Sequence, residues 1–148
     1  MKESISANEI ITSRVFEAPV ELVFQAWTNP EYIARWWGPN GFTNTFHEFE
    51  LKPGGNWKFD MHGPDGTTYA NHIIFVEILP LKQIVLNHVS APEFLITATF
   101  EDMGSSTRVT HRQLFKKTSV FENVKSICIE ANEQNFDRFA ELLNGMTI

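Results

Sequence analysis

The stretch that most constrains the fold of this chain is its last long one, from Ser119 to about Asn144. Spacings of three and four residues between its apolar positions predict an amphipathic helix of roughly 38 Å. Ser119 and Glu122 have the spacing of a capping box at the helix start. The apolar positions are Val120, Phe121, Val124, Ile127, Cys128, Ala131, Phe136, Phe139, Ala140, Leu142 and Leu143. A helix of this length needs a large apolar surface to pack against.

Two amides interrupt this apolar stripe. Asn132 and Asn135 lie on or beside it, at positions where a sealed core would favour leucine. A buried amide needs a hydrogen-bond partner, because an unmatched one costs about 1–3 kcal/mol. Amides on the inner face of a long helix therefore predict a cavity beneath it.

Most of the remaining chain has the alternating pattern of strands. Ala18-Pro19 and Asn29-Pro30-Glu31 predict the starts of two short helices after a first strand, with Pro19 at the first helical position and Asn29 as a cap. Short Pro- and Gly-containing turns separate the later strands, so they should pair antiparallel as a meander. The predicted strands span 10–17, 42–51, 56–62, 67–79, 82–89, 94–102 and 108–115.

These elements predict a single α+β domain over residues 1–148. We expect a curved antiparallel sheet of about six or seven strands wrapped around the long C-terminal helix, with two short helices after strand 1. The sequence contains no linker, internal repeat or low-complexity segment.

Composition excludes several classes of function. The formal net charge of -6 and the absence of a basic cluster argue against binding to nucleic acid or to an anionic membrane. The single cysteine, Cys128, rules out an internal disulfide framework and fits a reducing compartment. No stretch resembles a signal peptide or a membrane span, so we expect a cytoplasmic protein without membrane insertion. The sequence leaves open whether it acts as a monomer or as a homodimer.

Several motifs together resemble a known family. They are Arg14-Val15-Phe16-Glu17-Ala18-Pro19, Val23-Phe24-Gln25-Ala26-Trp27, Asn29-Pro30-Glu31, Arg35-Trp36-Trp37-Gly38-Pro39, Pro53-Gly54-Gly55 and Pro64-Asp65-Gly66. In this series the chain resembles the bacterial homologues of the activator of the heat-shock-protein ATPase. That family is part of the START-like (SRPBCC) superfamily, whose fold is the helix-grip.

The resemblance implies a deep, largely apolar cavity between the sheet and the long helix. It does not imply one activity, because the superfamily includes lipid carriers, pollen-allergen-like binders, aromatase/cyclases and co-chaperone modules. The chain also departs from the usual family pattern around the cavity. The strand before Pro80 lacks the common glycine, and the last helix lacks the common Gly-Trp pair before Asp137. No ligand can be transferred from a relative.

Histidines are the main candidates for chemistry in the sequence. His72, His88 and His111 each lie in a predicted strand among apolar neighbours. Their spacing matches no metal motif, and no nucleophile elbow or phosphate-binding loop is present, so we predict no metal and no cofactor. His111 and Gln113 alternate with Val109 on the strand face that should meet the helix. We predict that they orient a ligand, with Asn135 in support.

The hypothesis that best fits these patterns is binding of a small hydrophobic molecule (a lipid, an aromatic or a polyketide-like compound) without catalysis. The predicted apolar wall consists of Trp57, Phe59, Met61, Phe94, Ile96, Phe100, Val124, Cys128 and Phe139. One alternative is a cyclase/aromatase- or hydrolase-like enzyme in which His111 or His88 moves a proton. A second is a stress-related module that interacts with a chaperone through its outer surface.

Overall fold

A computed structural model of the chain describes residues 8–146. Its seven strands form one antiparallel sheet in the order β1-β7-β6-β5-β4-β3-β2. The elements are β1 (Glu9–Phe16), α1 (Val20–Thr28), α2 (Pro30–Trp36), β2 (Thr43–Phe49), β3 (Asn56–His62), β4 (Thr68–Leu79), β5 (Gln83–His88), β6 (Phe94–Asp102), β7 (Thr107–Phe115) and α3 (Thr118–Asn144). Strands β2 to β7 form the predicted meander, and β1 pairs with β7 at the far edge.

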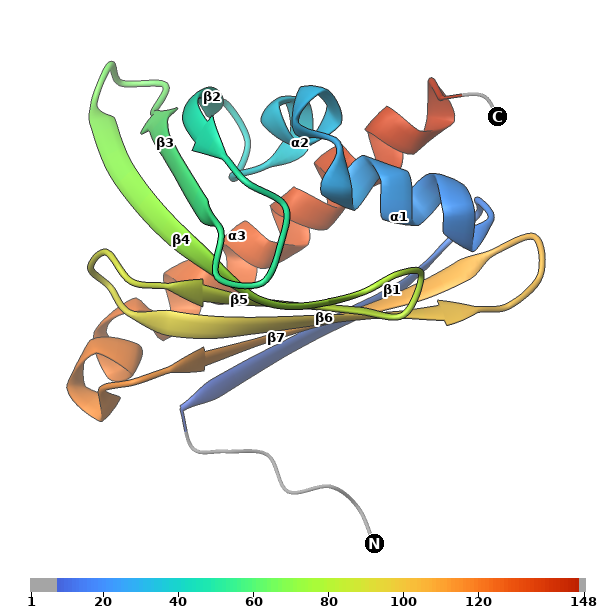
Figure 1. The fold of residues 1–148 in the computed structure, drawn as a ribbon. Helices are drawn as coiled ribbons and strands as arrows, with labels where there is room; N and C mark the ends of the chain where they lie inside the picture. Colours follow the sequence, from blue (N-terminus) through green and yellow to red (C-terminus); the bar gives the residue numbers. More distant parts are fainter. Residues whose placement is uncertain (1–7, 147–148) are drawn as a thin grey trace, which may run out of the picture.

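The sheet is strongly curved, and α3 crosses its concave side (Figure 1). Strands β2, β3 and β4 rise away from the flatter part of the sheet, and α1 and α2 lie beside one end of α3. The strand pairing shifts register between Phe46 and Glu48 and again between Phe75 and Glu77. Such bulges increase local twist and bend a strand, which suits a sheet that wraps around a helix. The predicted α+β architecture is confirmed.

The helix starts agree with the sequence prediction in one case and differ in two. The Asn29 side chain caps α2 as predicted, since its Oδ1 accepts a hydrogen bond from the Glu31 amide at 3.0 Å. The predicted capping box of α3 is wrong, because Lys117 is the N-cap residue and no side chain caps the helix. Pro19 is also the N-cap residue of α1 and not its first helical residue.

The predicted apolar stripe of α3 is too wide. Its buried residues are Phe121 near the start and Phe136, Phe139 and Leu143 towards the end. Ile127, which the stripe included, is 68% exposed. The residues of the middle turns are exposed or only partly buried. Within residues 8–146, no helix is long and apolar enough to cross a membrane.

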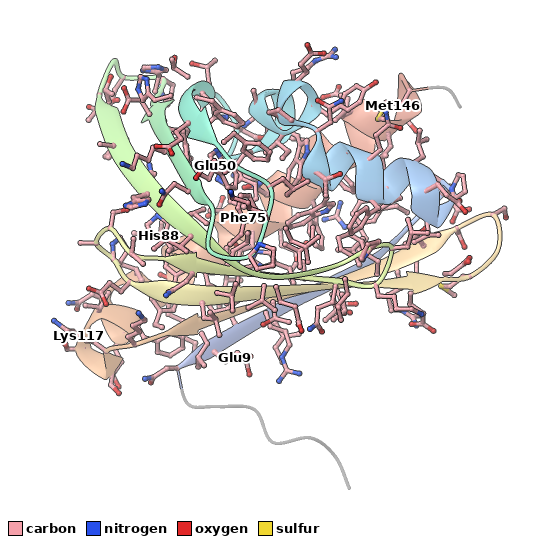
Figure 2. The ribbon with its side chains drawn as sticks, viewed as in Figure 1. Glu9, Glu50, Phe75, His88, Lys117 and Met146 are labelled. Atoms are coloured by element: carbon pink, nitrogen blue, oxygen red, sulfur yellow. The ribbon has the colours of Figure 1, made fainter. Side chains whose placement is uncertain are left out.

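Aromatic rings fill the core between the sheet and the helices (Figure 2). Phe139 of α3 is fully buried, and its ring centroid lies 5.0 Å from that of Phe16 and 4.7 Å from that of Trp36. A second group of rings surrounds Trp57 and Phe59, which stack with centroids 4.5 Å apart. Much of the aromatic content of the chain, which has 13 Phe and 4 Trp, therefore serves packing.

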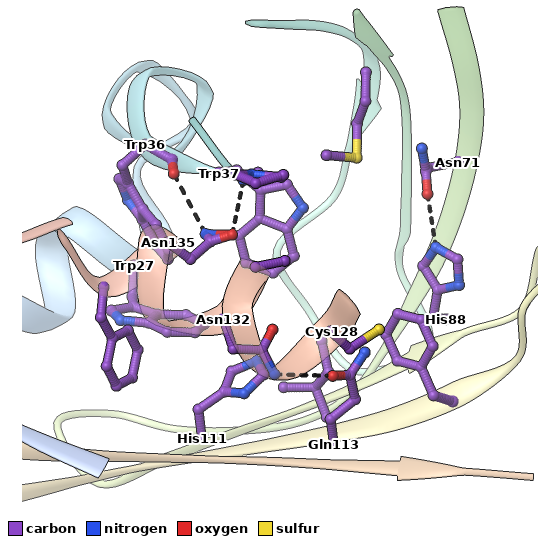
Figure 3. A pocket seen from close by; sticks show the side chains of 17 residues that line it. Trp27, Trp36, Trp37, Asn71, His88, His111, Gln113, Cys128, Asn132 and Asn135 are labelled. Carbon is purple, nitrogen blue, oxygen red and sulfur yellow. Dashed lines mark hydrogen bonds between the residues drawn. The ribbon is translucent and has the colours of Figure 1, made fainter. Parts of the chain in front are cut away.

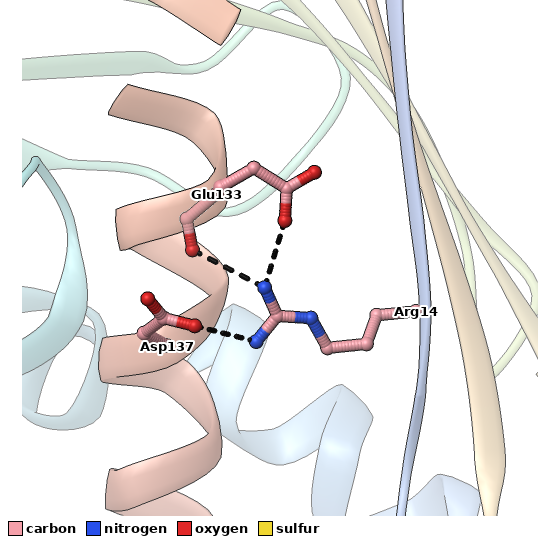
Figure 4. A network of polar contacts seen from close by, with 3 residues as sticks. All are labelled: Arg14, Glu133 and Asp137. Carbon is pink, nitrogen blue, oxygen red and sulfur yellow. Dashed lines mark hydrogen bonds and ion pairs between the residues drawn. The ribbon is translucent and has the colours of Figure 1, made fainter. Parts of the chain in front are cut away.

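A polar bridge joins the edge strand β1 to α3 on the outside of this core (Figure 4). The Arg14 guanidinium donates to a carboxylate oxygen of Glu133 and to one of Asp137, each at 2.8 Å. Its central carbon also lies 5.6 Å from the centroid of the Phe136 ring. Because Glu133 and Asp137 are one helical turn apart, one forked cation can bind both.

Candidate ligand-binding site

A pocket of about 190 Å³ lies beneath the middle of α3, where the helix stands away from the sheet (Figure 3). Strands of the sheet form its floor. The segment between α2 and β2, residues 37–42, forms part of its roof and is called the roof segment below. Its lining consists of Trp27, Trp36, Trp37, Gly38, Pro39, Met61, Asn71, His88, Phe94, Ile96, His111, Gln113, Cys128, Ala131, Asn132, Asn135 and Phe136.

Strand alternation brings two polar side chains of β7 to the pocket floor. His111 is 7% exposed and Gln113 is 5% exposed, both on the inward face of β7. The Gln113 Oε1 accepts a hydrogen bond from the Asn132 Nδ2 of α3 at 3.0 Å. Among the described residues, no hydrogen bond is found for the Gln113 amide nitrogen or for the Asn132 carbonyl oxygen. Figure 3 shows both groups at the pocket.

His111 lies in an aromatic environment with no charged neighbour at the pocket surface. Its ring centroid is 6.4 Å from that of Trp27 and 6.2 Å from that of Phe136. Its Nδ1 is buried and has no hydrogen-bond partner in the described part of the chain. Burial lowers the pKa of His111 to about 4, because the apolar surroundings disfavour the imidazolium. The ring is therefore neutral at pH 7.

A second histidine, His88, stands at the other end of the pocket and is held firmly. Its Nδ1 lies 2.8 Å from the Pro92 carbonyl oxygen, and its Nε2 lies 2.7 Å from the Asn71 Oδ1. Its ring stacks on Phe94 with centroids 4.3 Å apart and an interplanar angle of 3°. Burial lowers the pKa of His88 too. Both ring nitrogens are already engaged, so His88 presents mainly a flat surface to the pocket.

Polar side chains of α3 hold the roof segment in place. The Asn135 Oδ1 accepts from the Gly38 amide at 3.1 Å, and the Gln134 Oε1 accepts from the Asn40 amide at 3.0 Å. The Arg138 guanidinium donates to the backbone carbonyls of Arg35, Trp37, Gly38, Pro39 and Phe42 over 2.7–3.4 Å. Gly38 has φ of +100°, which other residues adopt only with strain. The roof is thus fixed by hydrogen bonds from one face of α3.

The structure brings part of the predicted site together. The predicted residues that line the pocket are His111, Gln113, Asn135, Met61, Phe94, Ile96 and Cys128. Asn135 lines the pocket, but both atoms of its side-chain amide already have partners. Its Oδ1 accepts from the Gly38 amide, and its Nδ2 donates to the Trp36 carbonyl at 3.4 Å. The partner of Gln113 on α3 is therefore Asn132, one turn before the predicted Asn135.

The other predicted wall residues lie outside the lining of this pocket. Trp57, Phe59, Phe100 and Phe139 belong to the main core, and Val124 packs against a smaller cluster around Ile10, Phe115 and Phe121. They do share the inward face, as strand and helix periodicity required. Periodicity does not say where along that face the rings close up and where a gap remains.

Sequence reasoning also missed residues that line the pocket. Trp27, Trp36 and Trp37 reach it from α1 and from the end of α2, and Phe136 reaches it from α3. The double tryptophan was visible as part of the family-like motif. Asn132 was visible as a break in the apolar stripe. Asn71 carried no signal, because an amide in a long strand is usually a surface residue.

The pocket lining is uncharged at neutral pH, since none of its residues is Asp, Glu, Lys or Arg and burial keeps His111 neutral. Burial raises the pKa of the Cys128 thiol, so this side chain remains protonated at pH 7. Within residues 8–146, no group of three or more His, Cys, Asp or Glu side chains could hold a metal ion. The site offers an apolar wall with a few neutral hydrogen-bonding groups.

A curved antiparallel sheet that wraps around a long C-terminal helix, with a pocket between the two, defines the helix-grip class of proteins. Residues 17–144 match the model of the family described as Activator of Hsp90 ATPase homolog 1-like protein. The chain belongs to this family, as its motifs predicted. A comparison with curated protein sequences gave no match.

Solved bacterial structures share the fold at low sequence identity. A protein from Nitrosomonas europaea is similar with a TM-score of 0.86 and 21% identity, over 95% of this chain and 97% of that one. A protein from Arthrobacter aurescens gives a TM-score of 0.88 and 22% identity, over 99% and 91% of the two chains. An AHSA1 protein from Silicibacter pomeroyi gives a TM-score of 0.75 and 16% identity, over 92% of this chain and 97% of that one. At these identities the likeness supports the fold alone.

Proposed function

We propose that this protein binds one small hydrophobic molecule in the pocket beneath α3. The observation that carries the proposal is an aromatic pocket whose floor has hydrogen-bonding groups without partners among the described residues, foremost the Gln113 amide nitrogen and the Asn132 carbonyl oxygen. Buried polar groups normally find partners during folding, and those left unpaired are candidates for contact with a ligand. Apolar walls with a few placed polar groups are typical of small-molecule sites.

The size of the pocket limits the ligand. An engineered protein cavity of about 150 Å³ holds one benzene molecule. The present pocket, at about 190 Å³, fits a compound of one or two rings. A long acyl chain or a multi-ring polyketide would need the roof segment to move.

The enzyme alternative has less support. A general base is commonly oriented by a further hydrogen-bonded group, and no such partner of the His111 Nδ1 is found in the described residues. His88 is engaged at both ring nitrogens. Turnover of a bound compound that is lost in His111→Phe would favour the enzyme. A change in the ATPase rate of a heat-shock chaperone, with the pocket empty, would favour the chaperone alternative that the family description suggests.

A cavity-filling variant tests the proposal directly. Ala131 is half-buried on α3 and lines the pocket, so Ala131→Trp should fill the space. Ile127 is on the same helix but 68% exposed, so Ile127→Trp adds the same group to the surface. Binding of an apolar fluorescent probe should saturate near one per chain in the wild type and in Ile127→Trp. It should be lost in Ala131→Trp.

Folding of both variants is checked by thermal unfolding before the titration. Equal probe binding in the folded Ala131→Trp and Ile127→Trp proteins would place the probe elsewhere and contradict the proposal.

The single cysteine gives a second readout, because Cys128 lines the pocket. A bound ligand should slow its reaction with a small neutral thiol reagent.

A further inference from the structure

The polar groups on the pocket floor carry information about the chemistry of the ligand beyond its hydrophobicity. We propose that the pocket selects an uncharged one- or two-ring aromatic compound with a hydroxyl group, bound at Gln113, Asn132 and His111, and rejects the matching carboxylate. This inference rests on the proposed function and specifies the ligand class of the same site.

Electrostatics exclude a charged ligand. No lysine or arginine lines the pocket, so a carboxylate inside it would be dehydrated without a counter-charge, which is strongly unfavourable. The arginines nearby are already occupied. Arg138 donates to the backbone carbonyls of the roof segment, and Arg14 pairs with Glu133 and Asp137 outside the core. Burial also keeps His111 neutral at pH 7.

The hydrogen-bonding pattern favours a hydroxyl over other neutral groups. The Gln113 Oε1 is used by Asn132, which leaves the Gln113 amide nitrogen as a donor and the Asn132 Oδ1 as an acceptor. The third group, the imidazole of His111, lines the pocket, and no hydrogen bond of its Nε2 is found in the described part of the chain. A hydroxyl both donates and accepts, so one such group can satisfy a donor and an acceptor together. A carbonyl would meet only the donor, and a hydrocarbon would meet neither.

The walls favour flat rings. Trp27, Trp36, Trp37 and Phe136 line the pocket, and His88 with Phe94 forms a stacked surface at its far end. Aromatic side chains pack well on the faces and edges of ligand rings. A volume of about 190 Å³ fits a two-ring compound such as naphthol.

Three probes of one shape test the inference: naphthalene, 2-naphthol and 2-naphthoate. Binding to the full chain is measured by equilibrium dialysis at pH 7. We expect 2-naphthol to bind about fivefold to tenfold more tightly than naphthalene, the worth of a typical net hydrogen bond. We expect 2-naphthoate to bind at least about a hundredfold more weakly than 2-naphthol, because its charge is buried unpaired.

Variants assign the preference to the named groups. Gln113→Leu and Asn132→Leu should each remove the advantage of 2-naphthol over naphthalene and leave naphthalene binding unchanged. Asn132 is half-buried on α3, so Asn132→Leu should fold even if Gln113→Leu, on β7, does not. Thr110→Val is the matched control, because Thr110 is on β7 with its side chain on the opposite face, 3.1 Å from the Ser13 hydroxyl.

The outcomes separate this inference from the proposed function. Saturable binding of all three probes with similar affinity would overturn the ligand class and leave hydrophobic binding intact. A hydroxyl preference that persists in both leucine variants would also overturn it. Failure of all three probes to saturate would count against the proposed function itself.

Discussion

His111 places an imidazole where its neighbours are aromatic rings, and this position affects the stability of the whole protein. The side chain is 7% exposed, and burial lowers its pKa to about 4. In the unfolded chain a histidine has a pKa of about 6.5. Below pH 6.5 the unfolded state therefore binds a proton that the folded state does not yet bind, and acid favours unfolding.

The pH dependence of stability tests this account. Between pH 7 and pH 5 the free energy of unfolding should fall by about 2 kcal/mol through His111 alone, since each pKa unit is worth about 1.4 kcal/mol. His111→Gln should remove this part of the fall. Urea unfolding at the two pH values measures it. His47→Gln is the control, because this imidazole is exposed at the sheet surface and the variant keeps His111. An unchanged acid sensitivity in His111→Gln would contradict the buried neutral state.

At the scale of elements, the contact between α3 and the roof segment is polar where most contacts between elements are apolar. Arg138 supplies the largest part of it, through the backbone carbonyls at and after the end of α2. A cation near a helix C-terminus also interacts favourably with the helix dipole. The roof therefore depends on one side chain whose fork geometry lysine cannot reproduce.

Replacing this arginine tests its role. Arg138→Lys should cost about 2–3 kcal/mol, because lysine keeps the charge but loses most of the donated hydrogen bonds. Backbone amides of residues 37–42 should also exchange with deuterium faster. Arg108→Lys, which alters an exposed pair with Glu101, should change stability by less than about 0.5 kcal/mol. Equal effects of the two variants on amide exchange at the roof would show that Arg138 does not hold it.

For the whole molecule, the decisive contact is the seam between the C-terminal half of α3 and the aromatic core. Phe139 is fully buried there, with its ring against Phe16, Trp27 and Trp36. The middle of the helix contributes less, as the exposure of Ile127 shows. The pocket lies beneath the middle of α3, between the buried Phe121 near its start and Phe139 near its end.

Substitutions at two positions of α3 measure this difference. Phe139→Ala should destabilise the protein by about 3–5 kcal/mol, and Phe139→Asp should prevent folding because it buries a charge in the seam. Ile127→Ala, on the exposed side, should cost less than about 0.5 kcal/mol. Thermal unfolding followed by circular dichroism provides the comparison. A Phe139→Asp protein with wild-type thermal stability would refute the packing of α3 described above.

The sequence by itself determined the elements, their order and the inward faces. Alternation identified the strands and placed His111 and Gln113 on the inner side of β7, and three- and four-residue spacing identified α3. These features depend on local periodicity, which follows directly from the order of apolar and polar residues in the sequence. The family-like motifs determined the way the sheet and helix combine. Boundaries shifted by a residue or two, as for the predicted strand 42–51, which spans Thr43–Phe49.

Only the tertiary structure decided which inward residues line a pocket and which fill the core. Trp57 and Met61 share one face of β3, yet Trp57 is sealed among other rings and Met61 reaches the pocket. The choice of Asn132 over Asn135 as the partner of Gln113 has the same origin, because it depends on the rotation and height of α3 above the sheet. Periodicity fixes the direction of a side chain from its own backbone. The gap between two packed elements depends on side chains far apart in the sequence, and so it is set only when the elements meet.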